Sequence, residues 1–162
     1  MNLRVVLTVP DFDEAVGFYR DALGLEQLAD WSGEDGRVIL LDVGHATLEL
    51  FDERQAESVD RIEAGRRVSG QVRLALEVED VDATAQHLVG AGATAEAAPV
   101  VPPWGGRNAR LRTPDGLQLT LFDQSESAPQ PQPTRNLGEV EVVPPAERTG
   151  HDDPAVVPVP PT

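Results

Sequence analysis

The chain has 162 residues, with 28 acidic side chains against 13 arginines and no lysine, which gives a formal net charge of -15. This length suits one domain with a hydrophobic core, and the acidic balance excludes nucleic acid as the default partner because it repels a polyanion. Cysteine is absent, which excludes disulfides and zinc-thiolate sites. With neither a leader pattern nor an apolar run long enough to span a bilayer, we expect a cytoplasmic protein that makes no contact with membranes.

The first residues alternate between two kinds of side chain, as a half-buried strand does. Residues 3–9 place apolar side chains on one face and Arg4 and Thr8 on the other. Asp11 follows, with Glu14 three residues later, and apolar side chains then recur at helical spacing until Gly24. The pattern predicts a strand followed by a helix that Asp11 caps.

Three further β-rich segments complete the first half of the chain. Residues 25–31 show a weaker strand pattern, and residues 37–43 and 46–51 flank a spacer of two residues, Gly44-His45. So short a spacer predicts a hairpin. We therefore assign residues 3–52 to one β-α-β-β-β module.

Residues 71–124 repeat the same order of elements. The segment Val9-Pro10-Asp11-Phe12-Asp13 is matched by Val78-Glu79-Asp80-Val81-Asp82, and Leu48-Glu49-Leu50-Phe51-Asp52 is matched by Leu119-Thr120-Leu121-Phe122-Asp123. Both matches lie about 70 residues apart. The agreement at both ends predicts a second copy of the module, in which Asp80 caps the helix.

Two segments lie outside the modules. Residues 53–70 are polar, with apolar residues spaced loosely as in a helix, and we interpret them as a linker. Residues 125–162 hold nine of the 14 prolines and are interpreted as a tail without stable structure. Residues 137–143 alternate like a strand, so an added edge strand or a partner-binding segment is the alternative there.

Six short motifs occur in the two modules and in their turns. They are Val9-x-Asp11, Phe18-Tyr19, Leu23-Gly24-Leu25, Leu48-Glu49-Leu50, Val78-x-Asp80-Val81-Asp82 and Thr113-Pro114-Asp115-Gly116. These motifs resemble those of the vicinal oxygen chelate superfamily, which includes glyoxalase I, the bleomycin-resistance proteins and the extradiol dioxygenases. The resemblance covers residues 3–124. It implies an α+β fold in which two tandem βαβββ modules form a curved mixed sheet that encloses a cup.

The resemblance also implies where metal ligands would stand. In metal-dependent members they lie on the first and last strand of each module, which here correspond to Arg4, Glu49, Arg73 and Thr120. Only Glu49 can bind a metal, because a guanidinium is charged and has no lone pair to donate. We therefore expect neither a metal nor another cofactor.

The same inward-facing positions predict a cup lined by charged residues. We expect Glu49 to lie between Arg4 and Arg73, either in salt bridges that close the cup or in a site that recognises an anionic ligand. Trp31 and Trp104 occur at the same stage of the two modules, where each caps a core edge or stacks on a planar ligand. Glu49 and Glu77 are the candidate bases. The predicted ligand-binding residues are Arg4, Thr8, Trp31, Leu40, Asp42, Glu49, Phe51, Arg73, Trp104, Arg110, Arg112 and Thr120.

These observations lead to three hypotheses about function. The first is a metal-independent protein that binds a small aromatic or polycyclic molecule such as an antibiotic, for example to sequester it, without catalysis. The alternative is an enzyme of the same superfamily, a lyase, isomerase or dioxygenase, which depends on a metal or uses Glu49 or Glu77 as base. The third is a scaffold with a closed cup and a partner-binding tail. A homodimer is expected because open sheet edges favour association.

Overall fold

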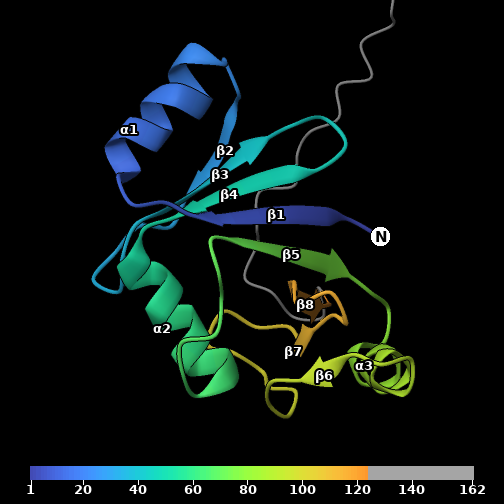
Figure 1. Ribbon diagram of the computed structural model, residues 1–162. Helices are drawn as coiled ribbons and strands as arrows, with labels where there is room; N and C mark the ends of the chain where they lie inside the picture. The colour runs from blue at the N-terminus through green and yellow to red at the C-terminus, as the bar shows by residue number, and fades with distance from the viewer. Residues whose placement is uncertain (124–162) are drawn as a thin grey trace, which may run out of the picture.

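A single mixed sheet organises the residues that the computed structural model describes, 1–123 (Figure 1). Its strand order is β2-β3-β4-β1-β5-β8-β7-β6, and the two modules meet where β1 (Leu3–Thr8) runs antiparallel to β5 (Val72–Glu77). The expected α+β fold is confirmed, with both modules paired inside one chain. The predictions for residues 125–162, including the strand pattern at 137–143, lie outside the described residues.

The first module contains the hairpin predicted from the Gly44-His45 spacer. β3 (Val38–Asp42) and β4 (Thr47–Phe51) pair antiparallel, β4 also pairs in parallel with β1, and β2 (Gln27–Asp30) forms the sheet edge. Each strand end agrees with the sequence pattern to within two residues.

The helix of this module begins where the sequence places its cap. The Asp11 carboxylate accepts a hydrogen bond from the Glu14 amide at 2.9 Å, and α1 (Phe12–Val16) starts there. The helix then continues as a π-helical segment, η1 (Gly17–Ala22), which the pattern of apolar residues did not predict. Buried apolar side chains of α1 pack against those of β3 and β4 and form the first core cluster.

The second module repeats this arrangement. β5 pairs in parallel with β8 (Gln118–Phe122), followed outward by β7 (Asn108–Arg112) and the short edge strand β6 (Thr94–Ala95). The helix α3 (Val81–Gly90) has Asp80 as its cap, in the manner of Asp11, and covers the second core cluster.

Side-chain contacts also repeat between the modules. Arg37 pairs with Asp13 at 2.6 Å, and Arg107 pairs with Asp82 at 2.9 Å. The duplication therefore includes loop contacts as well as strands and helices.

The loop before β7 packs closely against the end of β8. Gly106, with φ of 71°, leaves no room for a side chain, because a Cβ there would lie 2.5 Å from the Asp123 carbonyl oxygen.

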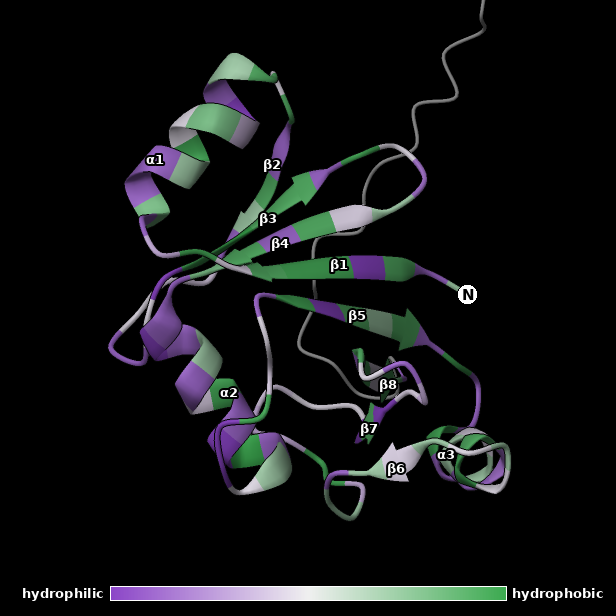
Figure 2. Ribbon diagram, viewed as in Figure 1, coloured by the Kyte–Doolittle hydropathy of each residue, from purple (hydrophilic) through white to green (hydrophobic). Residues whose placement is uncertain are grey.

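The segment interpreted as a linker contains the regular helix α2 (Glu53–Ala64), capped by Asp52. Its buried residues Ala56 and Val59 pack against Val6 and other apolar side chains on the concave face of the sheet, opposite α1 and α3. Most of the helix is hydrophilic (Figure 2). No helix within residues 1–123 has the length and apolar character needed to cross a membrane.

A buried polar cluster fastens α2 to the second module. Arg110 of β7 forms ion pairs with Asp60 and with Glu63, the latter at 2.6 Å, and its side chain is completely buried. Asp60 also accepts hydrogen bonds from the backbone amide and the hydroxyl of Ser69, at 2.7 and 2.6 Å. Burial acts to raise the pKa of Asp60, but the bonds from Ser69 and the charge of Arg110 outweigh it and lower this pKa to about 2. The cluster therefore holds α2 as a fixed wall over the sheet.

Candidate functional site

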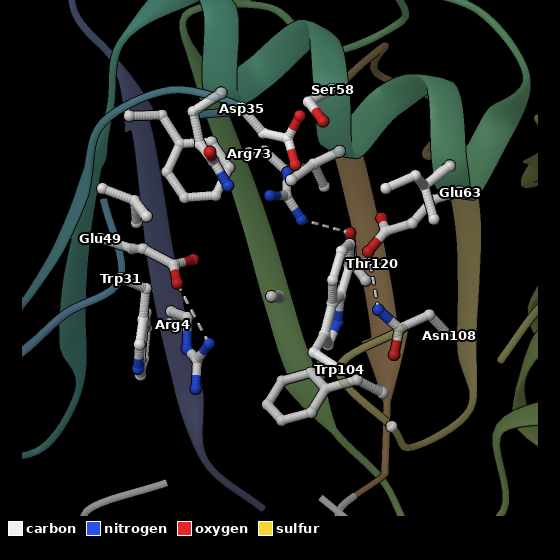
Figure 3. A pocket seen from close by; sticks show the side chains of 18 of the residues that line it. Arg4, Trp31, Asp35, Glu49, Ser58, Glu63, Arg73, Trp104, Asn108 and Thr120 are labelled. Carbon is white, nitrogen blue, oxygen red and sulfur yellow. Dashed lines mark hydrogen bonds and ion pairs between the residues drawn. The ribbon is translucent and has the colours of Figure 1, made fainter. Parts of the chain in front are cut away.

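A cavity of about 420 Å³ lies on the concave face between the two modules. Its base is formed by β1, β4, β5 and β8, and α2 forms one wall (Figure 3). This volume is within the range of ligand pockets in proteins. The cup inferred from the duplication is therefore an open cavity in the fold.

Glu49 lies on one side of the cavity and is 6% exposed. It accepts a hydrogen bond from Arg4 at 3.3 Å, which also makes the two side chains an ion pair. The Arg4 guanidinium lies 5.3 Å from the ring of Phe122. This pair combines a carboxylate and a cation inside a partly apolar space.

Arg73 lines the cavity from β5 and is 5% exposed. Its Nη1 donates to the Thr120 hydroxyl at 2.7 Å, and its guanidinium lies 5.7 Å from the ring of Phe51. Within residues 1–123 no ion pair joins Arg73 to a carboxylate; Glu49 pairs with Arg4 and acts on Arg73 through its charge. Burial, with the nearby charge of Arg110, lowers the pKa of Arg73 to about 10.

The four positions that correspond to metal ligands all line this cavity: Arg4, Glu49, Arg73 and Thr120. Their donors do not fit a divalent cation, because two of the four are guanidinium groups. Within residues 1–123 no group of three or more acidic or histidine side chains could hold a metal ion. The arrangement instead supplies two fixed positive charges of its own.

Two tryptophans line the cavity from loops of different modules. Trp31 follows β2 and is 39% exposed, and Trp104 precedes β7 and is 38% exposed. Both rings lie beside the space between Glu49 and Thr120 (Figure 3). Glu34 and Asp35, exposed residues of the loop after β2, add negative charge to the lining.

Of the predicted ligand-binding residues, seven line the cavity: Arg4, Trp31, Glu49, Phe51, Arg73, Trp104 and Thr120. The remaining predicted residues lie elsewhere on the sheet. Thr8 lies at the end of β1, Leu40 is buried within β3, and the Asp42 carboxylate accepts a hydrogen bond from the Gly44 amide at 2.7 Å. Strand alternation identified the face of the sheet on which these residues lie but not their distance from the cavity.

Three charged candidates also lie outside the cavity lining. Arg110 is covered by α2, in the ion pairs described above, and Arg112 pairs with Glu96 at 2.7 Å. Glu77, the second candidate base, lies at the end of β5, where it accepts a hydrogen bond from the Asn2 side chain. Glu49 is therefore the one of the two candidate bases that lies in the cavity.

Sequence reasoning missed the contribution of α2. Ser58, Ile62 and Glu63 line the cavity from this helix, and Asn108 joins them by donating to Glu63 at 2.7 Å. The available signal was the cap at Asp52, which matches the motif that starts the other two helices.

Comparison with known proteins identifies the family. Residues 3–121 match the model of the Glyoxalase/Bleomycin resistance protein/Dioxygenase superfamily, and the chain belongs to it. The uncharacterized protein YraH of Bacillus subtilis is 34% identical, over 74% of this chain and 95% of its own length. A 2-epi-5-epi-valiolone epimerase of an Actinomyces species is 30% identical, over 81% of this chain and 83% of its own.

Solved structures share the fold. The hypothetical protein BH1468 of Bacillus halodurans aligns with a TM-score of 0.58 at 18% identity. The alignment covers 78% of this chain and 95% of that one. At such low identity the likeness concerns the fold alone.

Proposed function

We propose that this chain is an enzyme that removes and returns a proton on a small anionic substrate, as an isomerase or epimerase does, without a metal ion. Glu49 is its general base. The observation that carries the proposal is the position of the Glu49 carboxylate, in a ligand-sized cavity beside the guanidinium of Arg4. The Arg4 guanidinium donates to the Glu49 carboxylate, and a carboxylate within reach of the substrate is what a general base requires.

The chemistry needs both charges. When a base takes a proton from a carbon next to a carbonyl group, the electron pair moves onto the carbonyl oxygen, and a fixed positive charge stabilises that oxygen. Arg4 and Arg73 are the cations in the cavity lining that can stabilise this oxygen, since both reach the cavity from the central strands. For an isomerase, Glu49 then returns the proton to a neighbouring atom of the intermediate. For an epimerase, water delivers a proton to the opposite face of the carbon and Glu49 releases its own proton to solvent. Either route leaves the enzyme unchanged.

The relatives favour an enzyme over a protein that only binds. The Actinomyces relative, at 30% identity over most of this chain, is named an epimerase. Binding and sequestration of an aromatic compound is the second candidate, and the placement of Trp31 and Trp104 beside the cavity favours it. The third hypothesis, a scaffold with a closed cup, conflicts with a cavity of about 420 Å³.

Proton exchange with solvent tests the proposal before the natural substrate is identified. A panel of small 2-oxo acids, 3-oxo acids and hydroxy ketones is incubated with the protein in D2O, and NMR detects deuterium at the carbon next to the carbonyl group. We expect exchange on at least one compound, unchanged by EDTA, and a loss of about 100-fold or more in Glu49→Gln. The matched control is Glu57→Gln, on an exposed part of α2.

Three results would overturn the proposal. The first is absence of exchange on every compound with the wild-type protein, and binding of panel compounds in that case would support the second candidate. The second is equal exchange by wild type and Glu49→Gln. The third is loss of activity on chelation, which would assign the chemistry to a metal.

A further inference from the structure

The cavity lining includes a buried cation, Arg73, which forms no ion pair with a carboxylate of residues 1–123. We infer that Arg73 and Thr120 form a subsite for the carboxylate of a small, singly charged organic acid. This inference deepens the proposed function and rests on it for the reaction, but the subsite is defined by contacts of its own.

A comparison of two buried arginines supports the subsite. Arg110 is completely buried and is held by two carboxylates, those of Asp60 and Glu63. Arg73 is 5% exposed, yet its hydrogen-bonded partner within residues 1–123 is the neutral hydroxyl of Thr120. A buried charge normally has an ionic partner, because removing it from water is costly. Arg73 therefore has the character of a binding group and Arg110 that of a structural one.

The neighbouring carboxylates are committed to other partners. Glu49 pairs with Arg4, and Glu63 is bound by both Arg110 and Asn108. Their charges act on Arg73 only at a distance. A carboxylate supplied by a ligand can use the donors of the guanidinium that Thr120 leaves available, since a guanidinium offers five N–H groups in a planar fork.

The position of these donors suits a ligand. The Arg73 guanidinium lies between Glu49 on one side of the cavity and Thr120 on the other (Figure 3). An acid held by Arg73 would therefore extend its body past Glu49 toward Trp31 and Trp104. This geometry places the anchoring group and the proposed base on one molecule.

Charge also limits the class of acid. Glu34 and Asp35 are exposed carboxylates in the cavity lining, and the chain carries a net charge of -15. Polyphosphates and other highly charged ligands would be repelled there more strongly than a single carboxylate, whose one charge the Arg73 guanidinium can match. The half-exposed tryptophans suit a cyclic or aromatic body.

Binding of benzoate and of its neutral isostere benzamide, measured by NMR titration of the full chain, tests the subsite. We expect wild-type protein to bind benzoate about tenfold or more tightly than benzamide. Arg73→Met is expected to lose that preference. Arg73→Lys should retain part of it, because the charge remains but the fork is lost. The control Arg61→Gln removes an equal charge from the exposed face of α2 and should bind as wild type does.

The outcomes separate the subsite from the catalytic proposal. Equal affinity of wild type for the two probes, or a preference that survives in Arg73→Met, would overturn the subsite. Circular dichroism and thermal unfolding establish whether the variants are folded. If Arg73→Met is not folded, Arg73→Lys replaces it in the comparison with wild type. A benzoate preference in both wild type and Glu49→Gln, without proton exchange on any panel compound, would uphold the subsite while the proposed reaction fails. Proton exchange by a protein that binds benzoate and benzamide equally would uphold the proposed reaction while the subsite fails.

Discussion

Arg73→Met should make the protein more stable while it removes the proposed ligand anchor. Burial lowers the pKa of Arg73 to about 10, well below that of an exposed arginine. One pKa unit corresponds to about 1.4 kcal/mol, so the folded state disfavours the charged side chain by about 3 kcal/mol. This penalty applies in full at neutral pH, because Arg73 is protonated in both the folded and the unfolded chain below pH 10, and it declines only as the pH rises above that value.

The substitution also has a cost. It breaks the hydrogen bond to Thr120, which contributes about 1 kcal/mol, while the methionine keeps much of the apolar stem in place. The expected net gain is about 1 to 2 kcal/mol, or about 3 to 6 °C in melting temperature. Thermal and urea unfolding at pH 7 measure it. A loss of stability greater than about 1 kcal/mol would show that Arg73 is a structural residue and refute the reasoning.

Three other changes test other parts of the structure. Asp60→Asn should destabilise the fold by about 3 kcal/mol in urea unfolding, because Arg110 loses one of its two buried carboxylates. In the wild type, the folded pKa of Asp60 is below its ordinary value of 3.8. About 2 kcal/mol of stability should therefore be lost as the pH falls from 4 toward 2. Melting curves of Asp60→Asn should lack that acid-dependent loss, and its persistence in the variant would contradict this assignment to Asp60. Trp104→Ala should weaken benzoate binding by about three- to tenfold with little change in melting temperature, and unchanged affinity would remove this ring from the site. Gly106→Ala should lower the free energy of unfolding by about 2 kcal/mol or more, and Gly44→Ala by about 1 kcal/mol. Gly44 shares the positive φ but has open space around it. Equal losses of stability in the two variants would contradict the packing of Gly106 against Asp123.

The elements that local signals specify were predictable from the sequence. Asp11 and Asp80 cap their helices as the pattern indicated, and the Gly44-His45 spacer forms the predicted hairpin turn. Because the helix cap and the last-strand motif each occur twice at matching distances, the repeat identified the fold as well as the elements. The π-helical continuation at residues 17–22 was not predictable, since apolar spacing does not distinguish it from an α-helix.

The helical spacing in α2 was visible in the sequence, but its packing against the sheet was not, because much of what the helix buries is polar. Only Ala56 and Val59 are its buried apolar residues, whereas Asp60 and Glu63 are buried through contacts with β7. An apolar stripe cannot reveal a helix that is fixed by ion pairs to a strand about 50 residues away in the chain.

The sequence pattern was limited in the same way for the residues of the cavity. Strand alternation correctly directed Arg73 and Arg110 to the concave face, but it could not show that α2 covers one and leaves the other in the cavity. The Arg4–Glu49 pair was foreseeable from adjacent parallel strands. The bond from Arg73 to Thr120 was not, because the sequence pattern did not give the strand order, in which Thr120 lies on the strand next to that of Arg73 and Glu49 lies two strands away.

The most direct test is the crystal structure of the protein bound to the acid that exchanges its proton fastest in the D2O panel. The account predicts the carboxylate of this acid on Arg73, with the exchanging carbon about 3 to 3.5 Å from a Glu49 carboxylate oxygen. An acid bound away from Arg73, a carbon out of reach of Glu49, or a metal ion between the ligand and the four positions Arg4, Glu49, Arg73 and Thr120 would contradict it.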